Sequence, residues 1–343
     1  MIALNVLQTG LSLLENHSLF LVFSFLLSFV ITFYLIPLAM RMAQQYGILD
    51  LPDGAIKTHK TPTPYLGGVA VCAGFVVAVL LCGAVDARIS FLLLGCTMLM
   101  LLGFADDLLV LSPVLKFGGQ ALIALSFVRA GLYLKESFFT ESWAIPLSLL
   151  WLLTCMNAIN LIDVMDGLAT TVALCASGGY LIFSVLNGNM MVAQVLILFM
   201  GALGAFFYYN RPQAKIYLGD AGSLFVGGFL GVIPLLISWS DFVPWGFLLA
   251  PLPMSVALLE LLGLMVIRTY KGIPFYKGSK DHLCHYLGRK GYSRWAILGY
   301  VTFFSLSVTI VGLAAYVGFI PLPTLFAVGI IFFAVWVVML KPK

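Results

Sequence analysis

Charged residues are scarce in this chain of 343 residues, of which 9% are Asp, Glu, Lys or Arg and 62% are hydrophobic. A soluble globular domain carries roughly 25% charged residues. The scarcity excludes an ordinary soluble protein and indicates an integral membrane protein. Because no soluble domain, low-complexity tract or clear internal repeat interrupts the apolar segments, we expect one membrane-embedded domain over residues 1–343.

Cysteine spacings typical of metal sites or disulfides are also missing. The six cysteines include no C-x-x-C pair, and five of them lie inside apolar runs, so we expect them to be packing residues. The first 17 residues contain Glu15 and no basic stretch. This is unlike a cleaved signal peptide.

Long apolar runs dominate the sequence instead. About 20 apolar residues in a helix cross the hydrocarbon core of a bilayer, and helices satisfy their own backbone hydrogen bonds there. The sequence therefore predicts an all-α, polytopic membrane protein with eleven transmembrane helices. The expected spans are Leu19–Met40, Leu66–Val85, Ile89–Ala105, Val114–Tyr133, Trp143–Ile162, Gly167–Leu186, Met190–Tyr209, Ala221–Ser240, Phe242–Ile267, Trp295–Gly318 and Ile320–Leu340.

Basic residues are distributed unevenly between the two sides of these spans. Of the 18 Lys and Arg residues, 15 fall on the side that holds the C-terminus and the loops after odd-numbered spans. The positive-inside rule then predicts an external N-terminus and a cytoplasmic C-terminus. Nine of the 14 acidic residues lie at or near the same side. Because an unpaired charge near a span costs several kcal/mol, we expect a compensating group, most simply a divalent cation.

The segment "GFADDLLVLSPVLK" closes the third expected span with Asp106 and Asp107. The two acids are either a polar helix end or a carboxylate pair that ligates Mg²⁺ or activates a nucleophile. Lys116 follows at the start of the next span, where it can neutralise a phosphate.

The segment "NAINLIDVMDGLA" closes the fifth expected span with four amide and carboxylate side chains: Asn157, Asn160, Asp163 and Asp166. The last three would share one face of a continuing helix. If the helix ends near Ile162, they line a turn at the cytoplasmic mouth, and Gly167 favours this turn. The alternative is an ordinary interhelical loop.

Two further polar segments lie on the predicted cytoplasmic side. In "KIYLGDAGSLFVGG", Asp220 stands at a helix N-terminus, which presents free N–H groups to anions. Asp220 is either a helix cap or a metal ligand beside a phosphate. Tyr217, in the same segment, is placed to stack on a base. In "DHLCHYL", His282 and His285 are three residues apart. Nearby Lys and Arg residues favour an anionic ligand over a zinc site there.

Together, these segments supply carboxylates for a metal, bases and a helix N-terminus for phosphates, amides, and an aromatic ring. These groups are what the transfer of a phosphorylated group from a nucleotide requires. A site embedded in a membrane implies a lipid acceptor.

Five ordered segments make the sequence resemble the polyprenyl-phosphate N-acetylhexosamine-1-phosphate transferases of glycosyltransferase family 4. They are "KTHKTPTPYLGG", "DDLLVLSPVLK", "NAINLIDVMDGLA", "KIYLGDAGSLFVGG" and "DHLCHYL". The resemblance implies an enzyme of the cell inner membrane whose active site faces the cytoplasm. Polyprenyl (undecaprenyl) phosphate would attack the β-phosphate of a UDP-N-acetylhexosamine, which gives a polyprenyl-diphospho-sugar and UMP. This would be the first step of a lipid-linked cell-envelope glycan, such as lipopolysaccharide or teichoic acid.

The same resemblance implies roles for individual residues. The catalytic residues would be Asp106, Asp107 and Asp220, with Asp220 and Asp106 as ligands of Mg²⁺, or of Mn²⁺ in its place. Substrate contacts would come from Lys57, His59, Lys116, Asn157, Asn160, Asp163, Asp166, Asn210, Tyr217, His282 and His285. A homodimer is a further implication, and no nucleic acid is expected as a partner.

The chain departs from the family pattern at several positions. Val164 stands where a glycine is usual, and Ile56 stands where the first loop usually has an arginine. Cys284 and Tyr286 replace a common histidine and a common arginine, and Glu260 occupies the place of an aspartate. A β-branched residue disfavours positive φ, so we expect the turn at Val164 to differ in shape.

The donor sugar and two other classes of protein remain open from the sequence. "PTPYLGG" and "HLCHYL" are more similar to the branch that uses UDP-GlcNAc than to the one that uses UDP-N-acetylmuramoyl-pentapeptide for peptidoglycan. The other classes are a membrane transporter and a catalytically inactive family member. A transporter is disfavoured because its site would lie at the membrane midplane, whereas these acids gather at one face.

Overall fold

The computed structural model describes residues 2–50, 62–136, 139–239, 245–274 and 281–340. It is a helical bundle with one two-stranded β pair. The helices are α1 (Ile2–Tyr46), α2 (Gly67–Leu81), α3 (Ala87–Leu109), α4 (Pro113–Arg129), α5 (Glu141–Ile162), α6 (Leu168–Leu186), α7 (Met190–Asn210), α8 (Gly219–Val232), α9 (Ser255–Tyr270), α10 (Leu283–Arg289), α11 (Arg294–Tyr316) and α12 (Leu322–Leu340). Two short 3₁₀ helices are η1 (Ile233–Leu236) and η2 (Gly246–Leu249), and the strands are β1 (Leu49–Asp50) and β2 (Thr63–Pro64).

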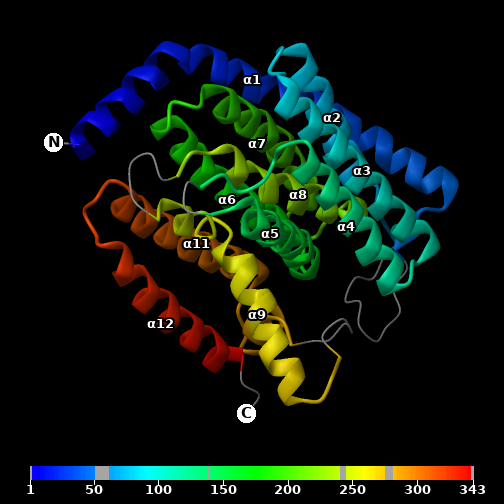
Figure 1. The fold of residues 1–343 in the computed structure, drawn as a ribbon. Helices are drawn as coiled ribbons and strands as arrows, with labels where there is room; N and C mark the ends of the chain where they lie inside the picture. The colour runs from blue at the N-terminus through cyan, green and yellow to red at the C-terminus, as the bar shows by residue number, and fades with distance from the viewer. Residues whose placement is uncertain (1, 51–61, 137–138, 240–244, 275–280, 341–343) are drawn as a thin grey trace.

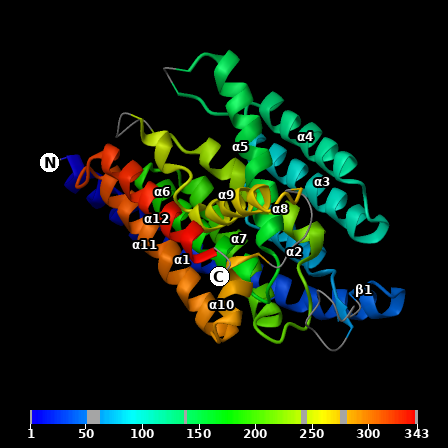
Figure 2. The ribbon, with the colours of Figure 1, turned by 90° about the horizontal axis from the view of Figure 1, so that it is seen from below.

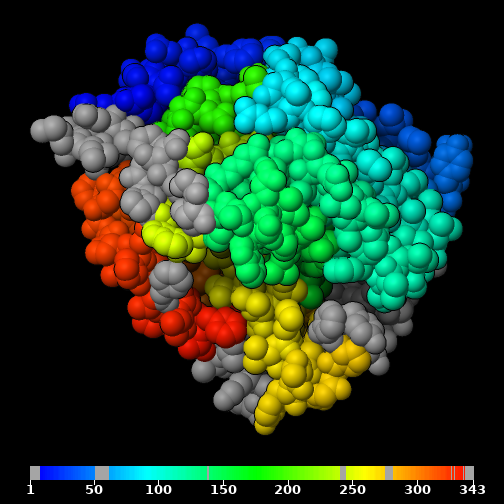
Figure 3. All heavy atoms as spheres, in the orientation of Figure 1, coloured from blue at the N-terminus to red at the C-terminus, as the bar shows by residue number. Residues whose placement is uncertain are grey.

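The predicted all-α, multi-pass membrane architecture is confirmed. Each of the eleven expected spans coincides with a helix, and α10 is an additional short one. Among the described residues, seven helices are long and apolar enough to cross a membrane. The exposed surface agrees, because α4 and α5, which form much of the face in Figure 3, expose large apolar side chains such as Leu122, Trp143 and Leu150. Apolar surface of this extent belongs in contact with lipid.

The expected ninth span, Phe242–Ile267, is not one continuous helix over its described residues, and Phe242 itself lies outside them. Helix α9 begins only at Ser255, and η2 precedes it. Pro251 and Pro253 explain the late start, because proline lacks the N–H that a helix interior needs and pushes the residue before it out of the helical region. The first helix differs in the other direction, since α1 runs well beyond the expected Leu19–Met40.

Several helices begin at a side-chain cap. Asp86, Ser112, Asn189 and Ser293 each accept a hydrogen bond from the backbone N–H three residues further on. Such a cap satisfies one of the free N–H groups in the first turn of a helix. These four polar residues therefore serve the backbone at the points where helices begin.

Helix α8 is the centre of the bundle and lies between α3 and α5 (Figure 1). All its residues from Ala221 to Val232 are buried. Helices α1 and α2 lie on one side of this centre, and α9, α11 and α12 lie on the other. Figure 2 shows α10 at the edge of the bundle beside α11.

The segment before α8 is held by the β pair and by the start of α2. Strands β1 and β2 are antiparallel, with Leu49 opposite Pro64. The N–H of Tyr217 donates to the carbonyl of Pro64, and the N–H of Gly67 donates to the carbonyl of Tyr217. These backbone bonds fix the approach to Asp220 from a part of the chain some 150 residues earlier.

Close contact between α3 and α8 depends on Gly103. A Cβ atom at Gly103 would lie 2.1 Å from the carbonyl oxygen of Asp220 and 2.6 Å from the nitrogen of Ala221. Both are backbone atoms, so the helices would have to move apart to admit it. The absence of a side chain at Gly103 therefore lets the end of α3 approach the start of α8.

Gly103→Ala should lower the thermal unfolding temperature of the purified protein in detergent, because overpacking costs about 1–3 kcal/mol. Gly118→Ala is the matched control in the neighbouring helix, since a Cβ there meets nothing within 4 Å. The control should be neutral or slightly stabilising, because alanine favours a helix over glycine by about 0.5–1 kcal/mol. Equal unfolding temperatures for the two variants would contradict the close-contact argument.

Candidate functional site

A polar cluster occupies the place where α3 ends, α4 begins, α5 ends and α8 begins. Its centre is the Lys116 ammonium, which lies 2.8 Å from Asp106 Oδ2 and 2.6 Å from Asp220 Oδ2. The lysine side chain is only 17% exposed, and that of Asp106 10%. Lys116 is therefore the compensating group for these two acids within the described structure, where the sequence led us to expect a divalent cation.

Asp106 has both carboxylate oxygens engaged. Oδ1 accepts the backbone N–H of Leu111 at 2.8 Å, while Oδ2 faces Lys116. The bond to Leu111 supports Val110, which ends α3 at a φ of +52°. Valine rarely adopts this left-handed conformation, so Asp106 helps to hold a strained helix end. An acid with two partners is better placed to bind a cation than to remove a proton.

Asp107 caps α8. Its Oδ1 accepts the N–H of Asp220 at 2.9 Å, and its Oδ2 accepts the N–H of Ala221 at 3.0 Å. These are among the N–H groups that have no partner within the helix, and a carboxylate is favoured at this end of the helix dipole. Asp107 therefore fixes the backbone of Asp220, and both its oxygens are committed to that contact.

Asn160 orients Asp220 from the other side. Its amide nitrogen donates to Asp220 Oδ1 at 2.5 Å and to the Ser223 hydroxyl at 2.8 Å. The Asn160 oxygen accepts from Lys116 at 3.5 Å. Asn157 lies one turn earlier on α5 and does not reach the acids, because its amide donates to Gln120 and to the carbonyl of Leu153.

Asp163 lies in a turn, which resolves the two alternatives for this segment. Helix α5 ends at Ile162, and the N–H of Val164 donates to the Ile162 carbonyl. Asp163, with φ −78° and ψ +59°, is the centre of an inverse γ-turn. The positive φ falls at Gly167, at +75°, so valine at position 164 is compatible with the turn.

The pKa of the Asp163 carboxyl is raised to about 7, mainly because burial disfavours the charged form and also because Asp220 and Asp107 carry like charge. Asp163 is therefore close enough to the acidic cluster to feel its field. A ligand that brings positive charge to the cluster would favour the ionised form of Asp163.

Asp166 and Asn210 hold neighbouring segments together. Asp166 Oδ2 accepts the N–H of Gln213 at 3.1 Å and forms an ion pair with Arg294 at the start of α11. Asn210 is 4% exposed; it accepts the N–H of Gly167 and donates to the carbonyl of Ile216. The structure thus places both residues as anchors of the loop that leads to Asp220.

The two histidines lie apart from these acids in the chain, at the start of α10. His282 is 4% exposed, and its Nδ1 lies 3.2 Å from Glu260 Oε1. The ring of His285 is 5.9 Å from that of His282. Lys57 and His59 lie outside the described residues.

Sequence reasoning missed several polar partners in this region: Gln120, Ser223 and Arg294. Gln120 stands four residues after Lys116, and Ser223 stands three after Asp220. Each is therefore on the same helix face as a residue that was predicted. Helical spacing was a usable signal for these two, whereas the pairing of Arg294 with Asp166 required the fold.

The chemistry of these donors fits a divalent cation. Oxygens of Asp106 and Asp220 converge on one point, where Lys116 places its ammonium. Within the described part of the chain, no three acidic, His or Cys side chains form a complete metal cage. Mg²⁺ is usually held by one or two carboxylates together with substrate phosphates, so the two carboxylates that meet at Lys116 are a fitting set.

Known proteins are similar to this chain in the region that contains the polar cluster. Residues 89–238, from α3 to the end of η1, match glycosyl transferase family 4. The match covers somewhat less than half of the chain and shows that this segment is similar to that family. A probable undecaprenyl-phosphate N-acetylglucosaminyl 1-phosphate transferase of Bacillus subtilis (strain 168) is 28% identical over 290 residues, 82% of this chain and 81% of that protein.

Relatives with a second named activity have a similar sequence identity to this chain. The phospho-N-acetylmuramoyl-pentapeptide-transferase of Staphylococcus carnosus (strain TM300) is 27% identical over 321 residues, which cover 85% of this chain and 97% of that protein. The phospho-N-acetylmuramoyl-pentapeptide-transferase of Bacillus thuringiensis (strain Al Hakam) is 28% identical over 323 residues, which cover 86% of this chain and 95% of that protein. The residues that match the family contain Asp106, Asp107, Lys116 and Asp220.

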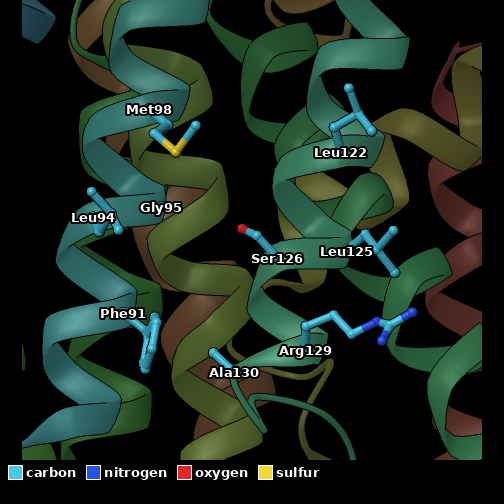
Figure 4. Close-up of a pocket in the computed structure, with 9 residues that line it drawn as sticks. All are labelled: Phe91, Leu94, Gly95, Met98, Leu122, Leu125, Ser126, Arg129 and Ala130. Carbon is cyan, nitrogen blue, oxygen red and sulfur yellow. The ribbon is translucent and has the colours of Figure 1, made fainter.

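The structure also has a groove of about 470 Å³ between α3 and α4 (Figure 4). The groove lies beside the first half of α3 and the second half of α4, away from Asp106 and Lys116. Phe91, Met98 and Ser126 line it, while Arg129 points away from the gap between the two helices. It is a lipid-facing surface and contributes no group to the polar cluster.

Asp107→Ala should cost about 2 kcal/mol of stability, because two partly buried N–H groups at the start of α8 lose their acceptor. Asp107→Asn keeps one acceptor oxygen and should lose less. Thermal unfolding of both variants in detergent measures the graded effect. An alanine variant as stable as wild type would show that Asp107 is not a cap.

Asp163→Asn should stabilise the ligand-free protein at pH 8 more than at pH 5. The folded-state pKa of Asp163 is about 7, above the ordinary value of 3.8, so folding favours the protonated form. The wild type therefore loses this stability as the pH rises from about 4 to about 7, whereas the amide does not titrate. Unfolding temperatures of both proteins at the two pH values test this, and an equal difference at both would contradict it.

Proposed function

We propose that this protein transfers a sugar 1-phosphate from a UDP-sugar to polyprenyl phosphate and releases UMP, in a reaction that depends on Mg²⁺. The observation that carries the proposal is the convergence of Asp106, Asp220 and Lys116 at the partly buried start of α8. The named activities of both kinds of relative, which act on a lipid phosphate or on a phosphorylated amino sugar, support the general reaction.

In this reaction an oxygen of the lipid phosphate attacks the β-phosphorus of the UDP-sugar. A new P–O bond forms while the bond from the β-phosphorus to the bridging oxygen breaks, and UMP leaves. No side chain has to remove a proton from the acceptor, because a phosphate monoester is largely ionised near pH 7. The engaged oxygens of Asp106 are consistent with this, and catalysis then rests on position and charge.

Each residue of the cluster has a part in this proposal. Asp220 and Asp106 would hold Mg²⁺, which supplies Lewis-acid stabilisation of the diphosphate. Lys116 would neutralise a phosphate oxygen, and Asn160 keeps Asp220 in place through its hydrogen bond. Asp163 and Tyr217, in the adjoining turn and loop, would bind the nucleotide.

The remaining predicted substrate contacts have narrower roles in the proposal. Three of them would support the substrate pocket indirectly, through hydrogen bonds to neighbouring segments. These bonds join Asn157 to Gln120, Asp166 to Gln213 and Asn210 to Gly167. His282 and His285 would approach the donor from α10. Lys57 and His59 remain candidates for the donor or acceptor phosphate.

For topology, we propose eleven spans with an external N-terminus and the site at the cytoplasmic face. The uneven distribution of Lys and Arg supports this orientation. For the donor, we propose UDP-GlcNAc, which the named activity of the Bacillus subtilis relative supports. Transfer from UDP-N-acetylmuramoyl-pentapeptide is the second candidate, because relatives with that activity align over most of the chain.

Asp220→Asn should reduce UMP release from UDP-GlcNAc at least a thousandfold, because a metal ligand at the reacting diphosphate is lost while the fold is kept. The assay uses purified protein in detergent with undecaprenyl phosphate and Mg²⁺. Asp86→Asn is the matched control: Asp86 caps the start of α3, and asparagine caps equally well.

The same assay separates the donors and tests the metal. Chelation of divalent cations should abolish UMP release, and added Mg²⁺ should restore it. UMP release from UDP-N-acetylmuramoyl-pentapeptide but not from UDP-GlcNAc would replace the proposed donor by the second candidate. Undiminished activity in the Asp220 variant would remove the proposed metal site.

A further inference from the structure

Glu260 is a buried carboxylate for which the proposed reaction has no use. It lies on α9 and is 2% exposed. Its Oε1 accepts the N–H of Leu283 at 3.0 Å, and its Oε2 accepts from the indole of Trp336 at 3.3 Å. His282 Nδ1 lies 3.2 Å from Oε1. Both oxygens therefore accept a hydrogen bond, one of them from the first residue of α10, and His282 lies beside Oε1 without a hydrogen bond at Nδ1.

Helix α10 depends on such contacts for its position. It has only seven residues, and a helix of that length is not stable on its own in water. Its first residues, Leu283 and Cys284, are buried and line one small gap together with Glu260, Ile162 and Leu168. Ile162 ends α5 and Leu168 begins α6. The start of α10 and both ends of the turn that carries Asp163 and Asp166 therefore border the same gap.

An apolar side chain at position 260 could fill the same buried space without the free-energy cost of removing a carboxylate from water. A buried carboxylate has to be compensated for its lost hydration, and apolar residues of similar volume are often neutral or stabilising in its place. What an apolar side chain cannot do is accept the Leu283 N–H and face His282. The carboxylate is thus suited to set the position of α10 rather than to strengthen the core.

We propose that Glu260 is a positioning residue of the transfer reaction: its carboxylate docks α10 against the α5–α6 turn and so places His282 and His285 for the nucleotide sugar. This inference rests on the proposed function for its kinetic part. Its structural part, the docking of α10, stands on the contacts of Glu260 alone.

The test compares Glu260→Leu with Leu264→Ala in the purified full-length protein. Leu264 lies one turn further along α9 and is 1% exposed, so its truncation destabilises the same helix without touching the Leu283 N–H. Amide hydrogen exchange of α10 is followed by mass spectrometry, with α11 as the internal reference. KM and kcat for UDP-GlcNAc are measured in parallel.

For Glu260→Leu we expect at least tenfold faster exchange in α10, unchanged exchange in α11, and a KM raised about tenfold with kcat within threefold. Leu264→Ala should lower the unfolding temperature but leave α10 exchange and KM within twofold of wild type. A third variant, Trp336→Phe, removes the indole donor to Glu260 but keeps the bond from the Leu283 N–H to Glu260, so it should also leave KM unchanged. Glu260→Gln should fall between wild type and leucine, because the amide keeps one acceptor for the Leu283 N–H.

Two results would overturn the proposal. Unchanged α10 exchange in Glu260→Leu would show that the carboxylate does not dock the helix. Faster exchange with an unchanged KM would show that the docked position does not serve the nucleotide sugar. If wild-type protein releases no UMP from any UDP-sugar, the proposed function fails, while the exchange of α10 still decides whether Glu260 docks it.

Discussion

Both oxygens of the Asp107 carboxylate accept N–H groups at the start of α8, and the geometry of the whole polar cluster depends on this contact. It fixes the backbone at Asp220, so the side chain of Asp220 meets Lys116 and Asn160 within hydrogen-bonding distance. Gly103, one turn before Asp107, lets the two helices approach closely enough for it. Because α8 is buried from Ala221 to Val232, a shift at its start would be transmitted to the centre of the bundle.

The membrane setting explains why so many polar groups are used as anchors. An unpaired charge or N–H group near lipid is costly, so each acid in the cluster has defined partners. Asp107 accepts hydrogen bonds from backbone N–H groups. Asp106 accepts the N–H of Leu111 and pairs with Lys116, and Asp166 accepts the N–H of Gln213 and pairs with Arg294. These partners come from different helices, so the contacts that satisfy the charges also set the distances between the helices that form the site.

Local patterns were sufficient to predict the helices and most of the cluster. Apolar runs predicted eleven helices, and the structure brings Asp106, Lys116, Asn160 and Asp220 from the predicted polar segments into contact. The start of α9 was missed because Pro251 and Pro253 lie in a run that is apolar throughout, so hydropathy alone shows no break. The partners of Lys116 were out of reach for another reason: Asp220 follows it by 104 residues, and no local spacing encodes such a contact.

The roles of polar residues within one segment also differ in a way that the sequence cannot show. Asn160, Asp163 and Asp166 are evenly spaced and looked equivalent as pocket residues. In the structure, Asn160 bonds to Asp220, Asp163 sits in a γ-turn, and Asp166 ties the next loop to α11. The difference arises because α5 ends at Ile162: before that point the helix directs side chains toward α8, and after it the turn directs them toward the loop before α8 and the start of α11. A helix end in the middle of an evenly spaced polar segment thus divides it into residues that face the acids and residues that hold the surrounding loops.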